Sequence, residues 1–221
     1  VLGEELEGEQ RELVEIIKQS GERLLETLNS VLDLARLESE ALGLDPRALN
    51  LGDELLAAAR LFGPMAEEKG LALELEVPDE AVRAQLDRAL LHRVVSNLLS
   101  NAIKFTEEGE VRLVLVSLGN EVQIQVKDTG IGIDEAFQPH LFEEFKQEST
   151  GLARTHTGSG LGLAITRRLV EQMHGRIEVH SVKGEGATFT VTFPATPPGV
   201  SSDADVPEQL DLFTDAETVK S

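Results

Sequence analysis

The stretch of sequence that decides the fold runs from His92 to Phe105 and reads H-R-V-V-S-N-L-L-S-N-A-I-K-F. Its apolar residues recur at three- and four-residue steps, which predicts an amphipathic helix over about 87–105. Asn97, Asn101 and Lys104 fall together on the other face of this helix. Their two carboxamides and one ammonium suit a hydrated Mg²⁺ that carries phosphates, because Mg²⁺ takes oxygen ligands and keeps waters. The alternative is an ordinary solvated helix face.

Two glycine-rich motifs follow further along the chain. The first, D-T-G-I-G at 128–132, comes directly after a strand-like segment, where a carboxylate can accept a hydrogen bond from an amino group such as that of adenine. The second, T-G-S-G-L-G at 157–162, runs into a helix whose unpaired amides suit phosphate oxygens. No strand leads into the second motif, which disfavours a Rossmann-type dinucleotide site. Taken singly, each motif is also compatible with a tight turn.

The segments around these motifs show both hydrophobic periods of a mixed domain. Helical periods predict helices over about 53–69, which Asp53 can cap, and over about 160–174. Alternating apolar residues predict strands over about 71–77, 111–117, 122–127, 176–181 and 187–193. This mixture of helices and strands predicts an α+β domain.

The composition excludes several classes of function. The chain has 221 residues, 41% of them hydrophobic, which is enough for a sizeable core. A formal net charge of −20 makes nonspecific binding to nucleic-acid phosphates unfavourable. The absence of cysteine excludes disulfides, thiolate nucleophiles and zinc–thiolate sites. We find no apolar run of transmembrane length and no export leader, so we expect this chain to act in the cytoplasm without a membrane segment.

A long helical period covers about 9–42, ahead of the mixed domain. Its apolar stripe consists of Leu13, Ile17, Leu24, Leu28, Val31 and Ala35. Such a helix is about 50 Å long at 1.5 Å per residue, so we expect it to pack on a partner helix. The alternative is a surface helix packed on its own domain. Residues 195–221 are rich in proline, serine and acidic residues, which indicates a tail or a linker.

In their order along the chain, the three motifs N-x-x-x-N, D-x-G-x-G and G-x-G-x-G resemble those of sensor histidine kinases. The resemblance covers about 44–194, which is similar to the catalytic and ATP-binding domain of the GHKL ATPase/kinase superfamily. It implies a two-layer α/β sandwich of the Bergerat type, with a mixed sheet covered by helices on one face. Residues 1–43 resemble the second helix of the dimerisation and phosphotransfer hairpin, and 195–221 resemble an acidic linker.

The resemblance also implies cofactors, partners and the roles of four residues. Asn101 would be the principal Mg²⁺ ligand, with Asn97 assisting. Lys104 and Arg154 would face the phosphates of ATP, with Arg154 inside a mobile lid over 146–159. The implied partners are a second copy of the chain, bound through the hairpin helix, and the receiver domain of a response regulator.

On the adenine side, the resemblance makes Asp128 the acceptor for the amino group. Gly130 and Gly132 would let the base approach. The other nucleotide-binding residues that it implies are Phe142, Phe145, Gly158, Ser159, Gly160, Leu161, Gly162 and Thr188. The sequence departs from the family pattern at Glu144, where proline is usual, and at Thr157, which replaces a common lid glycine.

One position bears on the mechanism. Hydrolytic members of the superfamily have a glutamate four residues before the metal-binding asparagine, where it can act as a general base on water. Here that position is Asn97, whose carboxamide cannot accept a proton. A neutral imidazole offers a lone pair without such activation. We therefore expect an ATP-dependent protein-histidine kinase whose phosphoryl group passes to an aspartate of a response regulator.

The histidines do not supply the expected phosphoacceptor. They are His92, His140, His156, His174 and His180, all within the ATP-binding region, where ordinary surface or turn histidines are the simplest interpretation. We expect the acceptor to lie on a first hairpin helix that precedes Val1. An alternative function is a degenerate or split kinase, which binds the nucleotide and a partner without phosphotransfer. An ATPase of the gyrase or chaperone kind is disfavoured by Asn97.

Overall fold

The computed structural model of the chain describes residues 43–147 and 160–195, together with single helical positions between Gln10 and Leu28. In chain order, its elements are β1 (Pro46–Asn50), α2 (Leu51–Glu68), β2 (Ala72–Glu76), β3 (Arg83–Asp87), α3 (Arg88–Phe105), β4 (Glu110–Ser117), β5 (Glu121–Asp128), the 3-10 helix η1 (Gln138–His140), α4 (Gly162–Gln172), β6 (Arg176–Val182) and β7 (Gly186–Pro194). Each helix and strand expected within these ranges is present, with ends that differ by at most two residues.

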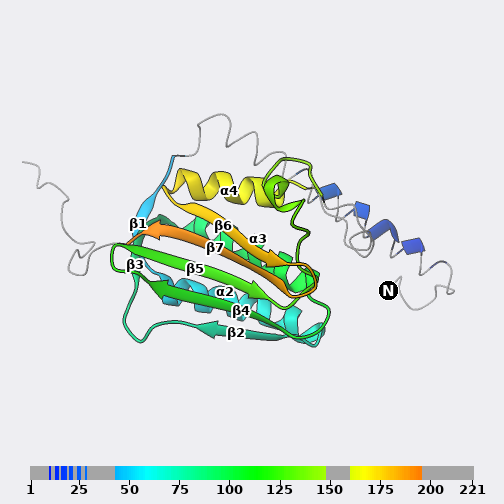
Figure 1. The fold of residues 1–221 in the computed structure, drawn as a ribbon, viewed down its shortest axis with the longest axis horizontal. Coiled ribbons are helices and arrows are strands. Elements are labelled where there is room, and N and C mark those ends of the chain that lie inside the picture. The colour runs from blue at the N-terminus through cyan, green and yellow to red at the C-terminus, as the bar shows by residue number, and fades with distance from the viewer. Residues whose placement is uncertain are drawn as a thin grey trace, which may run out of the picture.

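The main sheet has five strands in the order β2-β4-β5-β7-β6 (Figure 1). Only the pair β2–β4 is parallel, and the other three pairs are antiparallel. Figure 1 shows α2 and α3 behind the sheet, and α4 packs against α3 and β6, so the helices form a second layer. This arrangement confirms the α+β class and the mixed sheet covered by helices on one face.

Alternation along the strands separates a buried face of the sheet from a polar one. Leu113, Val126 and Phe189 are register partners across β4, β5 and β7, and all three are buried against the helices. One residue further along, Arg112 and Lys127 pair on the opposite face. The helices supply the matching apolar surface, because α3 buries eight residues along one side. The core therefore lies between the sheet and the three helices.

A second, two-stranded sheet joins β1 to β3, and the sequence analysis missed it. The strands pair antiparallel, from Pro46 opposite Asp87 to Asn50 opposite Arg83. Each has five residues, and β1 begins at a proline. In β1 only Leu49 is buried, and in β3 only Ala84 and Leu86 alternate, so neither segment has the longer run of alternating apolar residues that identified the strand over 71–77.

The start of α2 also differs from the expectation that Asp53 caps it. The N-cap is Asn50, whose side-chain oxygen accepts a hydrogen bond from the Gly52 amide at 3.2 Å. Asp53 instead lies in the first turn and accepts a hydrogen bond from the Asn50 side-chain amide at 2.7 Å. The chain leaves β1 in an extended conformation at Asn50, which brings that side chain to the free amides of the first turn.

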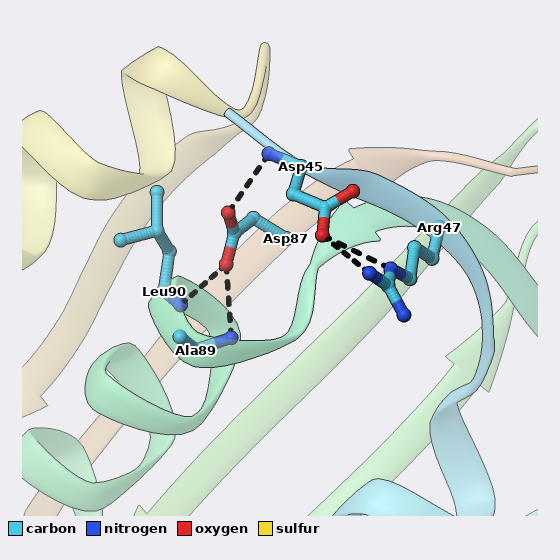
Figure 2. Close-up of polar contacts among 5 residues, drawn as sticks. All are labelled: Asp45, Arg47, Asp87, Ala89 and Leu90. Carbon is cyan, nitrogen blue, oxygen red and sulfur yellow. Dashed lines mark hydrogen bonds and ion pairs between the residues drawn. The ribbon is translucent and has the colours of Figure 1, made fainter. Parts of the chain in front are cut away.

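The start of α3 is tied to the beginning of β1 (Figure 2). One carboxylate oxygen of Asp87 accepts hydrogen bonds from the amides of Ala89 and Leu90, at 2.9 and 3.1 Å. The other oxygen accepts a hydrogen bond from the Asp45 amide at 3.1 Å. Arg47 pairs with the Asp45 carboxylate at 2.7 Å. One capping residue thus fixes both the first turn of α3 and the entry of the chain into the domain.

The ends of the chain are described in part only. The expected helix over 9–42 and the expected tail over 195–221 lie largely outside the described residues. In the part of the chain that the structure describes, no helix combines the length and the apolar character needed to cross a membrane.

Candidate nucleotide-binding site

The candidate site lies where the polar face of α3 meets the end of β5 and the start of α4. Asn97, Asn101 and Lys104 are all half-buried on this face. On the opposite side of α3, Leu99 and Ala102 are buried in the core. The division of the helix into an apolar and a polar face is therefore as the sequence predicts.

Asn97 is held against α4 by its side-chain amide. Its Nδ2 donates a hydrogen bond to Oγ1 of Thr166 at 2.7 Å, and Thr166 is almost fully buried. Its Oδ1 faces Gly162, where an added Cβ would lie only 2.7 Å from that oxygen. Gly162 thus lets the first turn of α4 approach Asn97. The sequence analysis did not single out Thr166, whose one signal is a hydroxyl in an otherwise apolar helix face.

Asn101 and Lys104 occupy the last two turns of the same face. None of the described residues makes a hydrogen bond with the Asn101 side chain, so its carboxamide oxygen can accept an external ligand. Lys104 places its ammonium 5.3 Å from the ring centre of Phe105. The two residues together offer one neutral oxygen and one positive charge.

Asp128 ends β5 with its side chain on the helix-covered face of the sheet. It pairs with Val111 on one side and with Ala187 on the other. Its Oδ1 accepts hydrogen bonds from the amides of Gly130 and Ala187, at 2.9 and 3.3 Å. Burial raises the pKa of Asp128, and these two hydrogen bonds oppose the rise in pKa only in part. Oδ2 accepts no hydrogen bond from the described residues.

The packing of the protein backbone explains why glycines follow Asp128. A Cβ at Gly130 would collide with the Phe105 carbonyl oxygen, at the end of α3. Gly132 has a φ of +60°, and a Cβ there would collide with the carbonyl oxygen of Val182. These glycines therefore let the loop pack between α3 and β6. That they also admit a flat base stays a prediction.

Two residues that the sequence analysis missed hold the far end of this loop. Ser181 accepts a hydrogen bond from the Ile133 amide at 2.9 Å and donates one to the Gly186 carbonyl at 2.7 Å. The Gln138 side chain donates to the carbonyls of Ser181 and Ile133, at 2.9 and 3.2 Å. Neither residue belongs to a recognisable motif, because its partners are distant in sequence.

The phenylalanine pair and the second glycine motif meet near the start of α4. The Phe145 amide donates a hydrogen bond to the Gly160 carbonyl at 3.0 Å, and both residues have positive φ values. Phe145 is 64% exposed, whereas Phe142 packs on the core with the Arg167 guanidinium 6.0 Å from its ring centre. Leu161 is fully buried, so its side chain belongs to the core.

Four expected site residues are not joined to this group. Arg154, Gly158 and Ser159 lie outside the described residues. Thr188 pairs with Lys127 and His180, one residue out of phase with Asp128. Successive side chains of a strand point to opposite faces, so Thr188 lies on the polar face of the sheet, away from Asp128.

Comparisons with known proteins identify relatives of this arrangement. The family described as "Histidine kinase-, DNA gyrase B-, and HSP90-like ATPase" matches residues 86–197, and the "His Kinase A (phospho-acceptor) domain" matches residues 1–40. The chain is 40% identical over 188 residues to the circadian input-output histidine kinase CikA of Synechococcus elongatus, which covers 84% of this chain and 25% of CikA. It is 36% identical over 193 residues to the autoinducer 2 sensor kinase/phosphatase LuxQ of Vibrio parahaemolyticus, covering 84% of this chain and 22% of LuxQ.

Among solved structures, full-length ShkA in complex with AMPPNP matches with a TM-score of 0.72 and 34% identity. The match covers 87% of this chain and 40% of ShkA. The chain thus spans about a quarter of the length of the curated relatives and less than half of this structure.

Proposed function

The chain belongs to the histidine kinase-, DNA gyrase B- and HSP90-like ATPases, on the sensor histidine kinase branch, and from this premise we propose that it binds Mg-ATP and transfers the γ-phosphoryl group to a histidine. One observation carries the proposal. Asn101 and Asp128 each present an oxygen that accepts no hydrogen bond from the described residues, and the packing of Gly130 against Phe105 joins their two elements. The candidate site thus has two parts held side by side. We call the part around Asn101 and Lys104 the metal-and-phosphate half, and the part around Asp128, Gly130 and Gly132 the base half.

In the base half, Oδ2 of Asp128 would accept a hydrogen bond from the amino group of adenine. Because Oδ1 is already fixed by two backbone amides, the carboxylate has a defined orientation before the nucleotide binds. A preoriented acceptor loses little entropy on binding. Gly130 and Gly132 keep side chains off the loop that borders the base.

In the metal-and-phosphate half, Asn101 is the principal ligand of Mg²⁺, and Lys104 faces the phosphates. Bound Mg²⁺ supplies neutralisation of the charge that develops on the phosphoryl oxygens. Arg154, Gly158, Ser159 and Gly160 would complete this half from the segment between the phenylalanine pair and α4. The role of the protein is then positioning and charge neutralisation.

Asn97 favours transfer to histidine over hydrolysis. Its carboxamide is engaged with Thr166 and cannot remove a proton from water. Water near the γ-phosphoryl group is then a poor nucleophile, whereas a neutral imidazole needs no general base of that kind. Asn97 assists the metal only through Oδ1, which faces Gly162.

The acceptor and the partners complete the proposal. No histidine precedes His92 in this sequence, so residues 1–43 hold no phosphoacceptor, and the proposed acceptor is a histidine on a hairpin helix of the kind that the histidine kinase family uses. In the N-terminal segment, Leu13, Ile17, Leu24 and Leu28 are each more than half exposed, which supports packing against other helices. We assign residues 1–43 to the second hairpin helix, 44–194 to the catalytic domain and 195–221 to a linker. A response regulator then receives the phosphoryl group.

Radiolabelled ATP tests this proposal. The chain is incubated with Mg²⁺ and γ-labelled ATP, with and without a histidine-bearing hairpin taken from another sensor histidine kinase. As a control, that kinase must phosphorylate the same hairpin under the same conditions. We expect label on the hairpin in an acid-labile, base-stable form, and its loss in Asn101→Ala. Binding of ATP without any transfer would instead support a nucleotide-binding interaction module, and absence of ATP binding would overturn both.

A further inference from the structure

The C-terminus of α3 has an unusual partner for its free carbonyl groups. A helix leaves its last four carbonyl oxygens without partners inside the helix. At this end, the Lys69 ammonium donates hydrogen bonds to the carbonyl oxygens of Ile103, Lys104 and Thr106, at 2.7, 2.8 and 2.7 Å. Lys69 is itself the C-cap of α2, some 35 residues earlier in the chain. One side chain thus joins the ends of two helices.

The Phe105 carbonyl group, which lies between those of Lys104 and Thr106 in sequence, has a different partner, the loop after Asp128. The Phe105 oxygen accepts a hydrogen bond from the Ile131 amide at 3.2 Å, and Gly130 packs against the same oxygen. Four consecutive carbonyl groups are therefore held, three by Lys69 and one by the loop after Asp128. The end of α3 is clamped between α2 and the base half of the site.

The charge of Lys69 matters for this contact. Three acceptors need three N–H donors, which an ammonium has and a neutral amine lacks. A cation at a helix C-terminus is also favoured by the helix dipole. In the absence of Lys69, three carbonyl oxygens would lose this partner, two of them on the buried residues Ile103 and Thr106, and the last turn of α3 could shift.

The last two turns of α3 carry the residues assigned to the metal and the phosphates. Asn101 lies two residues before Ile103, and Lys104 is itself one of the residues whose carbonyl group Lys69 holds. Resting on the proposed function, we propose that Lys69 is a positioning residue, which fixes Asn101 and Lys104 for Mg²⁺ and phosphate. It does so without touching the nucleotide.

The base half has supports of its own. Asp128 is oriented by the amides of Gly130 and Ala187, and Ile133 is held by Ser181. None of these contacts involves Lys69. The loop after Asp128 does contact the Phe105 carbonyl, next to the carbonyl groups that Lys69 holds, but the Asp128 carboxylate is oriented by other hydrogen bonds. Loss of Lys69 should therefore weaken the binding of a metal–phosphate ligand much more than the binding of a base alone.

This selectivity is the test. In Lys69→Met, calorimetry with Mg²⁺ and AMPPNP should give a Kd about tenfold higher than that of the wild type, the scale of loss seen when support of a metal ligand is removed. NMR titration with adenosine should give a Kd within about twofold of the wild type. Arg60→Met is the matched control, because it removes one positive charge from an exposed position of α2, and both Kd values should stay unchanged.

The outcomes separate the two proposals. Equal losses for both ligands, or no loss for either, would overturn the positioning role of Lys69. If the wild type binds neither ligand, the proposed function fails instead. Far-UV circular dichroism and thermal melting check that Lys69→Met is folded. If it is not, Lys69→Arg, which keeps the charge but changes the geometry of the donors, carries the same comparison with a smaller selective loss.

Discussion

The side-chain amide of Asn97 donates a hydrogen bond to the hydroxyl of Thr166 at 2.7 Å, and this bond links the polar face of α3 to the first turns of α4. The two residues are 69 positions apart in the chain. Because Gly162 also approaches Asn97, the bond sets the distance between the asparagine motif and the second glycine motif.

Thr166→Val should lower the stability of the domain and loosen this link. Valine keeps the shape of threonine but leaves the Asn97 amide without its acceptor, at a cost of about 1–2 kcal/mol in the free energy of unfolding. Urea unfolding followed by circular dichroism measures the loss. Thr166→Ser keeps the hydroxyl and is the matched control. A valine variant as stable as the wild type would show that the bond contributes nothing.

Asn97→Glu should raise ATP hydrolysis. A carboxylate at this position can accept a proton from water, and the Thr166 hydroxyl can still donate to it. General-base catalysis is worth about 100-fold or more when the geometry is right, so even imperfect geometry should give an increase of about tenfold. Release of phosphate from ATP measures the rate. Asn97→Gln, which adds the same length without a base, should show no increase, and equal rates in both variants would contradict the proposed role.

The buried carboxyl of Asp128 should make nucleotide binding sensitive to acid. Its pKa is raised above the ordinary value of 3.8, mainly by burial. Only the ionised form offers Oδ2 as an acceptor on both lone pairs, so affinity for AMPPNP should fall as the pH drops through this raised pKa. Calorimetry between about pH 4 and pH 7 measures the change, with Asp128→Asn as a variant whose affinity should be low and nearly independent of pH.

The same raised pKa should affect stability in the opposite direction to affinity: acid acting on Asp128 weakens nucleotide binding but stabilises the fold. The folded protein holds the Asp128 proton more tightly than the unfolded chain does, so the protonated carboxyl contributes stability below the unfolded pKa. That contribution is lost as the pH rises through the folded pKa. Relative to Asp128→Asn, the wild type should therefore lose stability as the pH rises from about 4. Urea midpoints of both proteins measure this difference, and a constant difference would contradict the raised pKa.

Gly132→Ala should cost more stability than Gly119→Ala, although both glycines have positive φ values. A side chain at Gly132 meets the Val182 carbonyl, whereas one at Gly119 meets open space within 4 Å. Gly119→Ala thus reports the backbone strain alone, about 1 kcal/mol, and Gly132→Ala adds the collision. Thermal melting compares the two variants. Similar losses would mean that the loop can move away from β6 without cost.

Much of this fold could be predicted because its elements have strong local periods. The division of α3 into Asn97, Asn101 and Lys104 on one side and a buried apolar stripe on the other follows from helical spacing alone. The strands of the main sheet alternate over five or more residues, which is enough to identify them. Which face of the sheet a residue of one strand shares with a residue of another is harder to predict, because it depends on the register between the strands. Thr188 and Asp128, for example, lie on opposite faces because of the register between β5 and β7.

The contacts that the sequence analysis missed join residues far apart in the chain. Lys69 and the end of α3 are separated by 34 to 37 residues, and no periodic pattern relates them. Asn50 and Asp53 are both good capping residues, and only the path of the unexpected strand β1 decides between them. Likewise, the glycines after Asp128 suggested a ligand, whereas the structure shows that backbone packing already requires them.

The strand order also constrains how the domain is synthesised. Among the described residues β7 is the last strand in sequence, and it lies between β5 and β6, so this sheet cannot close until residues up to Pro194 have left the ribosome (Figure 1). Until then, β5 has an open edge along its whole length, ready to pair with another chain. The Ala187 amide that orients Asp128 also arrives with this strand. The Asp128 carboxylate of a nascent chain therefore lacks one of its two backbone hydrogen-bond donors until β7 has been made and has paired with β5.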